Sequence, residues 1–254
     1  MNYPKIIFLN INFRYDNSSG LTISKLVSCI PKKNLGLLSI YAKTSDIDIF
    51  QNKYQLTNQE AKLGFDHDNK RKNEHEIKNP GLQKRIYYQL KKKLKIIVGR
   101  KLKTQEYYLN VPLKNWLIKF NPDFIFINPD KEETILFAIK IANFLDCKII
   151  IHVMDDKVNK RYQGIIGYYD KRKFKYVFSK IVHQANVCLS ISEKMAVEYY
   201  KKYKKVFYSF HNPININDWN QHIKNNWDLN NEIKIVYSGF IGSTIKPILE
   251  FCYA

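Results

Sequence analysis

The clearest chemical grouping in the chain is His152-Val153-Met154-Asp155-Asp156, in which two adjacent carboxylates closely follow a histidine. An imidazole or a carboxylate can accept a proton from a hydroxyl nucleophile. Adjacent like charges also raise each other's pKa, which suits a general base. The alternative is a structural cluster, in which His152 bonds to the backbone and Asp155 or Asp156 caps the next segment. The residues alone leave both interpretations open.

This grouping lies at the end of Lys148–Val153, an apolar run typical of a strand that is buried on both faces. Similar runs alternate along the chain with longer stretches of helical periodicity. We predict strands at 5–10, 35–41, 124–128, 148–153, 187–191 and 206–210, and helices at 21–30, 106–120, 132–145, 170–185 and 193–203. This alternation predicts an α/β fold with a doubly wound, Rossmann-like parallel sheet. Ligands bind such a sheet beyond the carboxyl ends of its strands, where His152 stands.

Two other strand ends carry candidate binding residues. Ser19 and Gly20 lie in a turn after the first strand, where backbone N–H groups can hold an anion or a sugar hydroxyl. Ser192 and Glu193 begin a predicted helix whose N-terminus can also face a ligand. The alternative in both places is ordinary capping of the helix that follows.

A third strand end is interpreted as structural. The strand at 124–128 is followed by Pro129-Asp130-Lys131-Glu132-Glu133. Acidic residues in a first helical turn interact favourably with the helix dipole. We therefore interpret these acids as capping groups.

Several common kinds of site are absent from the sequence. There is no Ser/His/Asp order, H-E-x-x-H motif, P-loop, G-x-G-x-x-G or zinc spacing. The four cysteines are far apart, so we expect reduced thiols without a disulfide or a metal site. No apolar run approaches the roughly 18 residues of a membrane span, and the N-terminal run does not resemble a signal peptide. We therefore expect a cytoplasmic protein with no permanently bound cofactor.

The formal net charge of +19 favours anionic partners: nucleic acid, anionic lipid or phosphorylated substrates. Part of the lysine excess is attributable to codon bias, because Lys, Asn, Ile and Tyr share A/T-rich codons. Residues 81–103 concentrate nine Lys or Arg residues, without an acid, around one apolar helical face. This segment is either a solvated amphipathic helix packed on the sheet or a surface that docks on an anionic membrane leaflet. No nucleic-acid-binding pattern of the RRM, KH or helix-turn-helix kind occurs.

Taken in order, these pieces resemble the retaining GT-B glycosyltransferases of the family-four type, which include bacterial polysaccharide and lipopolysaccharide enzymes. The matching segments are KIIFLN (5–10) with the turn at 18–22, NPDFIFIN (121–128), IIIHVMDD (149–156), ANVCLSISEKMAVEYYKKY (185–203), FHNPIN (210–215) and IVYSGFIG (235–242). Each segment is loose by itself. Their order across nearly the whole chain carries the resemblance.

The resemblance implies two Rossmann-like domains, one for an acceptor and one for a nucleotide-sugar donor, with a cleft between them. Residues 1–210 correspond to the acceptor domain, 211–231 to the interdomain linker and 232–254 to the start of the donor domain. The family continues on the donor side with a basic pair and an E-x7-E element, and the chain ends at Ala254 before them. We therefore expect a truncated enzyme, or a half-enzyme completed by a second chain that supplies the donor domain.

The resemblance also implies roles for the candidate residues. His152, Asp155 and Asp156 line the reaction centre and contact the transferred sugar or the acceptor hydroxyl. The turn at Ser19 and Gly20 lies near the donor phosphate, and Ser192 and Glu193 face the cleft. The loop of Gly239, Phe240 and Gly242 approaches the donor diphosphate.

The expected partners follow from the same resemblance. They are a nucleotide-diphosphate sugar as co-substrate, without a metal, and a glycan or lipid-linked acceptor at the inner face of a membrane. Two alternatives to a glycosyltransferase stay open. One is a catalytically inert fragment or subunit, and the other is a basic nucleic-acid-binding α/β protein.

Overall fold

The computed structural model describes residues 3–11, 13, 18–40, 48–57, 60–62, 106–158, 164–210, 216–220 and 223. The chain divides into two compact units, Met1–Pro213 and Ile214–Ala254. The described part of the second unit is residues 216–220, which form the short helix α7 (Ile216–Asn220), and residue 223. The basic segment 81–103, the predicted start of a donor domain at 232–254, and most of the predicted linker lie outside the described residues. The predicted domain boundaries therefore stay predictions.

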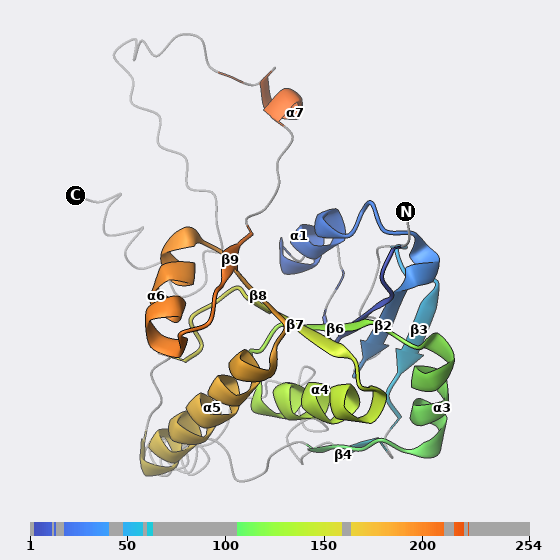
Figure 1. Ribbon diagram of the computed structural model, residues 1–254, viewed down its shortest axis with the longest axis horizontal. Coiled ribbons are helices and arrows are strands. Elements are labelled where there is room, and N and C mark those ends of the chain that lie inside the picture. Colours follow the sequence, from blue (N-terminus) through green and yellow to red (C-terminus); the bar gives the residue numbers. More distant parts are fainter. Residues whose placement is uncertain are drawn as a thin grey trace, which may run out of the picture. The chain divides into compact units, whose positions relative to one another are not determined.

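The first unit is built on a seven-stranded sheet in the order β3-β2-β1-β6-β7-β8-β9 (Figure 1). Every neighbouring pair in this sheet is parallel. The strands are β1 (Ile6–Leu9), β2 (Leu35–Ser39), β3 (Asn52–Gln55), β6 (Phe124–Ile127), β7 (Lys148–Val153), β8 (Val187–Ser190) and β9 (Tyr208–Ser209). The order reverses between β1 and β6, which is the switch point where doubly wound sheets bind ligands. The predicted fold class is confirmed.

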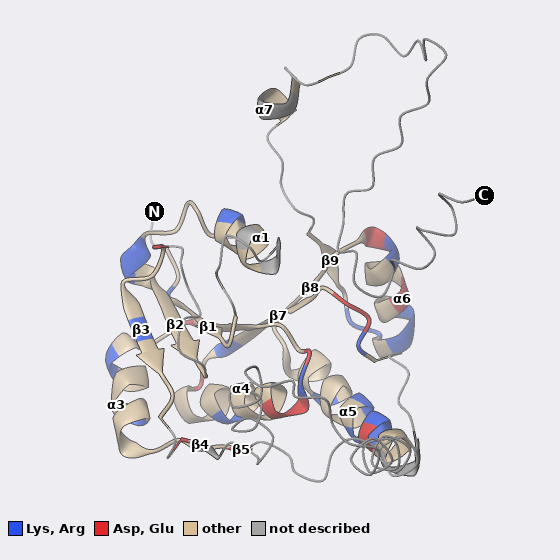
Figure 2. Ribbon diagram, turned by 180° about the vertical axis from the view of Figure 1, so that it is seen from behind, with Lys and Arg blue, Asp and Glu red and all other residues tan. Residues whose placement is uncertain are grey.

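Helices cover both faces of this sheet (Figure 1). Helix α1 (Ser18–Leu26) lies on one face. The other face is covered by α3 (Val111–Phe120), α4 (Glu132–Leu145), α5 (Gly164–Gln184) and α6 (Glu193–Tyr203). A short 3-10 helix, η1 (Lys32–Asn34), precedes β2, and a separate antiparallel pair joins β4 (Ala61–Lys62) to β5 (Glu106–Tyr107). Lys and Arg residues mark α5 and α6 in Figure 2.

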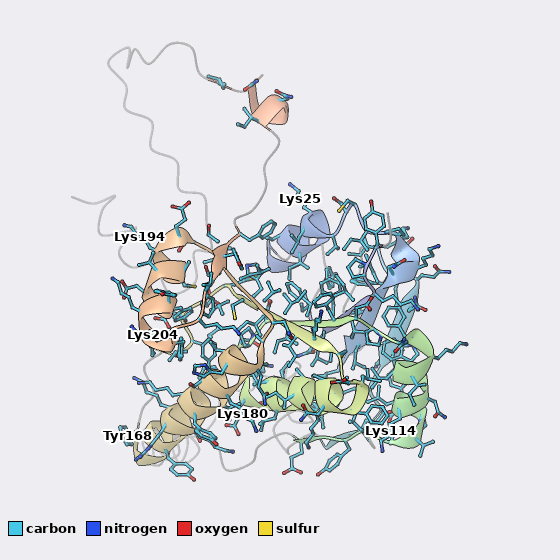
Figure 3. All side chains as sticks on the ribbon, viewed as in Figure 1. Lys25, Lys114, Tyr168, Lys180, Lys194 and Lys204 are labelled. Carbon is cyan, nitrogen blue, oxygen red and sulfur yellow. The ribbon has the colours of Figure 1, made fainter. Side chains whose placement is uncertain are left out.

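A hydrophobic core lies between the sheet and the helices on each of its two faces, and side chains fill this space (Figure 3). Strand β7 shows the division, because successive side chains of a strand point to opposite faces. Ile149, Ile151 and Val153 belong to the larger core beneath α3 to α6, whereas Ile150 and Met154 pack against the smaller core on the α1 side. The smaller core is largely aromatic: the rings of Phe8, Phe13, Phe50 and Phe126 lie with centroids 4.6 to 5.6 Å apart.

The predicted helices at 132–145 and 193–203 are confirmed. The helix predicted from 106 begins instead at Val111, because the Asn110 side chain accepts a hydrogen bond from the Leu113 N–H at 3.1 Å. The turn predicted at Ser19 and Gly20 is also corrected. Helix α1 begins at Ser18, so both residues lie in its first turn, where backbone N–H groups have no intrahelical acceptor.

Gly36 of β2 offers a test of this packing. A methyl group at this position would lie 3.1 Å from Cε1 of Phe120 and 3.2 Å from Cγ1 of Ile7. Both neighbours are buried, and the Phe120 ring stacks on Trp116. We expect Gly36→Ala to lower the free energy of unfolding by about 1 kcal/mol or more in urea denaturation, since overpacking forces neighbours to shift. Lys33→Ala on nearby η1 is the exposed control, and equal stability of both variants would contradict this account.

Candidate functional site

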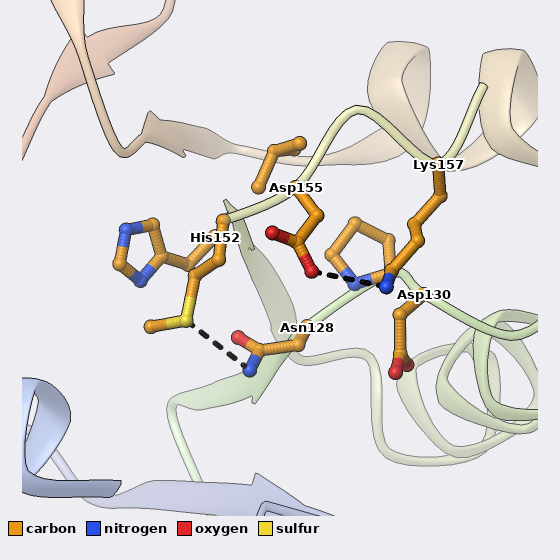
Figure 4. Close-up of a pocket in the computed structure, with 8 residues that line it drawn as sticks. Asn128, Asp130, His152, Asp155 and Lys157 are labelled. Carbon is orange, nitrogen blue, oxygen red and sulfur yellow. Dashed lines mark hydrogen bonds and ion pairs between the residues drawn. The ribbon is translucent and has the colours of Figure 1, made fainter. Parts of the chain in front are cut away.

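A small cavity lies at the carboxyl ends of β6 and β7, next to the switch point of the sheet. The two strands pair in register through Ile127 and Ile151, so the following residues, Asn128 and His152, stand side by side. The cavity has a volume of about 90 Å³. It is lined by Asn128, Pro129, Asp130, His152, Val153, Met154, Asp155 and Lys157 (Figure 4).

His152 forms the innermost part of this site. It is fully buried, although it borders the cavity, so the residues nearer the mouth separate its ring from solvent. The ring stands edge-on between Phe126, at a centroid distance of 6.2 Å, and Phe210, at 6.1 Å. In Figure 4 the imidazole points away from Lys157 and Asp130. Neither ring nitrogen has a hydrogen-bond partner among the described residues.

The surroundings of His152 change its acid–base chemistry. Burial lowers the pKa of the imidazole to about 4, because removal from water disfavours the charged form. The Phe210 backbone opposes this effect but does not reach hydrogen-bond geometry. The ring is therefore neutral at neutral pH. Such a ring is a weak general base and a good hydrogen-bonding partner for an uncharged hydroxyl.

Asn128 adds a second unsatisfied group at the same edge of the sheet. Its Oδ1 atom is buried without a partner among the described residues, while its Nδ2 group makes only a weak contact with Sδ of Met154 at 3.8 Å. A buried polar atom left without a hydrogen bond costs about 1–3 kcal/mol. Asn128 and His152 together supply an acceptor and two ring nitrogens that ligand hydroxyl groups would satisfy.

Charged side chains surround the mouth of the cavity. Oδ2 of Asp155 lies 3.0 Å from Nζ of Lys157, and the aspartate side chain is 71% exposed, so this ion pair is weakly stabilising. Asp130 lies on the other side of Lys157 (Figure 4). Desolvation raises the pKa of Asp130, while the charges of Lys131 and Lys157 act in the opposite direction.

The interpretation of Asp130 as a helix cap is wrong. The N-cap position of α4 is Lys131, and no side-chain hydrogen bond caps that helix. Glu132 and Glu133 do lie in the first turn of α4, as predicted. Asp130 lies before the first turn of α4. Its backbone N–H donates a hydrogen bond to the Asn128 carbonyl at 2.9 Å, in a tight turn that precedes the helix.

Asp156 does not line the cavity. The hydroxyl group of Tyr199 on α6 donates a hydrogen bond to its Oδ1 atom at 3.1 Å. Tyr199 is buried among the rings of Phe178, Tyr203 and Phe207, and burial, followed by the charge of Asp156, raises its pKa. Asp156 therefore ties the loop after β7 to α6, and of the two adjacent carboxylates only Asp155 lines the cavity.

The other candidate residues also stand outside the cavity lining. Oγ of Ser192 accepts the N–H of Met195 at 3.2 Å, which confirms its predicted capping role, and Glu193 is exposed in the first turn of α6. Gly20 is buried in the first turn of α1. Binding roles for Ser19, Gly20, Ser192 and Glu193 stay predictions. Gly239, Phe240 and Gly242 lie outside the described residues.

Sequence reasoning missed Asn128, Asp130 and Lys157 as parts of one site. The sequence did contain a signal for Asn128. Two apolar runs that are consecutive in the chain are each followed by a polar residue, Asn128 in one and His152 in the other. Within the described ranges, no cluster of three His, Cys, Asp or Glu residues could hold a metal ion. In the same ranges, no helix has the length and apolar character needed to cross a membrane.

Comparison with known proteins finds no matching family model and no matching curated protein. Among solved structures, the chain is similar to Anabaena Alr3699/HepE in complex with UDP and glucose, at 10% identity and a TM-score of 0.47 over 85% of this chain and 46% of that one. The complex with UDP gives 11% identity and a TM-score of 0.48 over 84% and 45%, and the complex with UDP-glucose gives 10% and 0.46 over 85% and 45%. The chain thus spans less than half of these solved chains. Similarity at this level adds nothing to the description of the site.

Replacing the unsatisfied histidine by an apolar residue should stabilise the fold. We expect His152→Leu to raise the free energy of unfolding by about 1 kcal/mol, since it removes two unpaired nitrogens from between Phe126 and Phe210. Ser190→Ala is the matched control in denaturant titrations. Its buried hydroxyl donates to the Ser192 carbonyl at 3.1 Å, so its loss should destabilise. Destabilisation by His152→Leu would show that the imidazole is satisfied.

The pH dependence of stability gives a separate test of His152. The pKa is about 4 in the folded protein, against an ordinary value of 6.5 in the unfolded chain. As the pH falls from about 6.5 to about 4, His152 becomes protonated in the unfolded chain but stays neutral in the folded protein. The free energy of unfolding should therefore fall by an amount on the order of 3 kcal/mol over this window and be unaffected by this residue at higher pH. The difference between wild type and His152→Leu isolates the effect, and parallel pH profiles would contradict it.

Proposed function

We propose that this chain provides the acceptor side of a glycosyltransferase, which transfers a sugar from a nucleotide-diphosphate sugar to a glycan or lipid-linked acceptor. The observation that carries the proposal is the pair of buried, unsatisfied groups, Asn128 Oδ1 and the His152 nitrogens, at the carboxyl edge of a doubly wound sheet. Sugar hydroxyls both donate and accept hydrogen bonds, so they match this set. The order of sequence motifs supports the same reaction class.

The residues then divide the work. His152, neutral at neutral pH, would hold and orient a hydroxyl group rather than remove its proton. Asp155 at the mouth would contact the reacting hydroxyl through its carboxyl group, which Lys157 holds in place from 3.0 Å. Asp156 would act only as a positioning residue, through Tyr199.

The size of the cavity limits what it can hold. Pockets that enclose a whole small-molecule ligand measure roughly 300–1,000 Å³, whereas this one measures about 90 Å³. One or two hydroxyl-bearing groups of a sugar fit such a space. The bulk of a nucleotide sugar would lie outside this cavity. We propose that the loop of Gly239, Phe240 and Gly242 binds its diphosphate.

The proposal is tested by transfer assays on the protein as its source organism makes it. The donors should be a panel of nucleotide sugars that includes UDP-glucose, the compound bound by Anabaena HepE in one solved complex. We expect His152→Leu to lower the turnover number at least about a hundredfold, the usual effect of removing one preorganised hydrogen-bonding group. Asp155→Asn should act similarly.

Tyr199→Phe is the matched control for these variants. It removes only the hydroxyl group that donates a hydrogen bond to Asp156. We therefore expect a small change in turnover with some loss of stability. Undiminished transfer by His152→Leu would contradict the proposed role of His152 in holding a hydroxyl group. If no donor and acceptor pair reacts, calorimetric titration of the 254-residue chain with glycans would decide whether the edge of β6 and β7 binds sugar at all.

A further inference from the structure

The outer face of α5 combines exposed tyrosines with basic side chains. Tyr168, Tyr169 and Tyr176 are 70%, 68% and 72% exposed, so most of each ring faces away from the core. At 100° per residue, Arg172 and Lys175 lie on the same side of the helix as these rings. Figure 3 shows Tyr168 projecting from the N-terminal end of α5 and Lys180 further along it, and Figure 2 shows blue along this helix. We call Tyr168, Tyr169, Arg172, Lys175 and Tyr176 the outer face of α5.

The opposite side of α5 is fully used by the fold. Phe174, Val177, Phe178 and Ile181 are buried in the larger core. The helix is therefore held without its outer face, which no residue in the described part of the chain covers. With 21 residues it presents a ridge about 31 Å long.

The charge beside this face is one-sided. Residues 171–180 contain five Lys or Arg residues and no acid. Lys173 is neutralised by Glu132 of α4 at 2.5 Å. Lys202 of α6 extends the basic surface: after burial, repulsion from Lys175 and Lys171 lowers its pKa, while Asp156 acts in the opposite direction. At 100° per residue, Asp170 falls on the side of Val177 and Ile181 rather than among the outer residues. Crowded like charges repel one another, and an anionic surface would relieve that repulsion.

We propose that the outer face of α5, with Lys171 and Lys202 beside it, docks on an anionic lipid bilayer. A phenol ring has an apolar body and a polar tip, and it is stable at headgroup level, where the hydroxyl group stays in water. Each basic side chain near an anionic leaflet adds about 1 kcal/mol of attraction. A straight ridge with exposed rings suits a planar surface. Single-stranded nucleic acid instead prefers a groove in which bases stack on flat rings. This inference does not depend on the proposed function.

Vesicle sedimentation of the 254-residue chain tests the inference. We expect binding to vesicles of phosphatidylcholine with phosphatidylglycerol, little binding to phosphatidylcholine alone, and weakening at high salt. The variant Lys171→Gln/Arg172→Gln/Lys175→Gln should bind anionic vesicles about tenfold less tightly or worse. The variant Tyr168→Ser/Tyr169→Ser/Tyr176→Ser should lose the part of binding that persists at high salt.

Two controls separate this face from general charge. Lys33→Gln/Lys53→Gln/Lys119→Gln removes the same charge from exposed positions on η1, β3 and α3, and it should bind almost as wild type does. Lys91→Gln/Lys92→Gln/Lys93→Gln tests the basic segment 81–103 in the same assay. The inference is overturned if the α5 basic variant binds no worse than the first control, or if wild type binds neutral vesicles equally well. Salt-sensitive binding to RNA that exceeds vesicle binding and is lost in the α5 variants would also overturn it, in favour of nucleic acid.

Discussion

The parallel register between β6 and β7 is the constraint on which the candidate site depends. It places Asn128 beside His152 at the point where both strands leave the sheet. The backbone of the two strands cannot supply hydrogen bonds to these side chains, because its N–H and C=O groups are already bonded to the neighbouring strands. The side chains must find partners at the edge, and among the described residues they do not find enough. A doubly wound sheet thus creates binding capacity at the carboxyl ends of its strands, out of groups that the fold leaves unsatisfied.

The surrounding structure makes this arrangement tolerable. The rings of Phe126 and Phe210 hold the imidazole edge-on and keep it dry, which lowers its pKa and keeps it neutral. The hydrogen bond from Tyr199 to Asp156 fixes the loop after β7 against an aromatic cluster of the larger core. Rigid neighbours of this kind hold unsatisfied polar groups in place, at a cost in stability that the large cores offset.

Helix α5 shows how one element can serve two purposes. Its inner residues pack with α6 and the sheet around Phe178, next to the tyrosine that anchors Asp156. Its outer residues carry aromatic rings and positive charge that the fold itself does not need. Because the inner face alone secures the helix, the outer face can vary in charge and polarity without loss of the fold. The site at β6 and β7 and the surface of α5 are therefore independent properties of one domain.

The sequence by itself determined the class of fold and the local signals. The alternation of short apolar runs with amphipathic stretches depends only on near neighbours, which is why 132–145 and 193–203 were predicted to the residue and Ser192 was identified as a cap. Tertiary structure decided the rest. Strand order placed Asn128 and Asp130 beside His152, burial gave the histidine a pKa of about 4, and packing turned Asp156 toward Tyr199. These outcomes depend on residues distant in the chain, whose proximity no local pattern encodes.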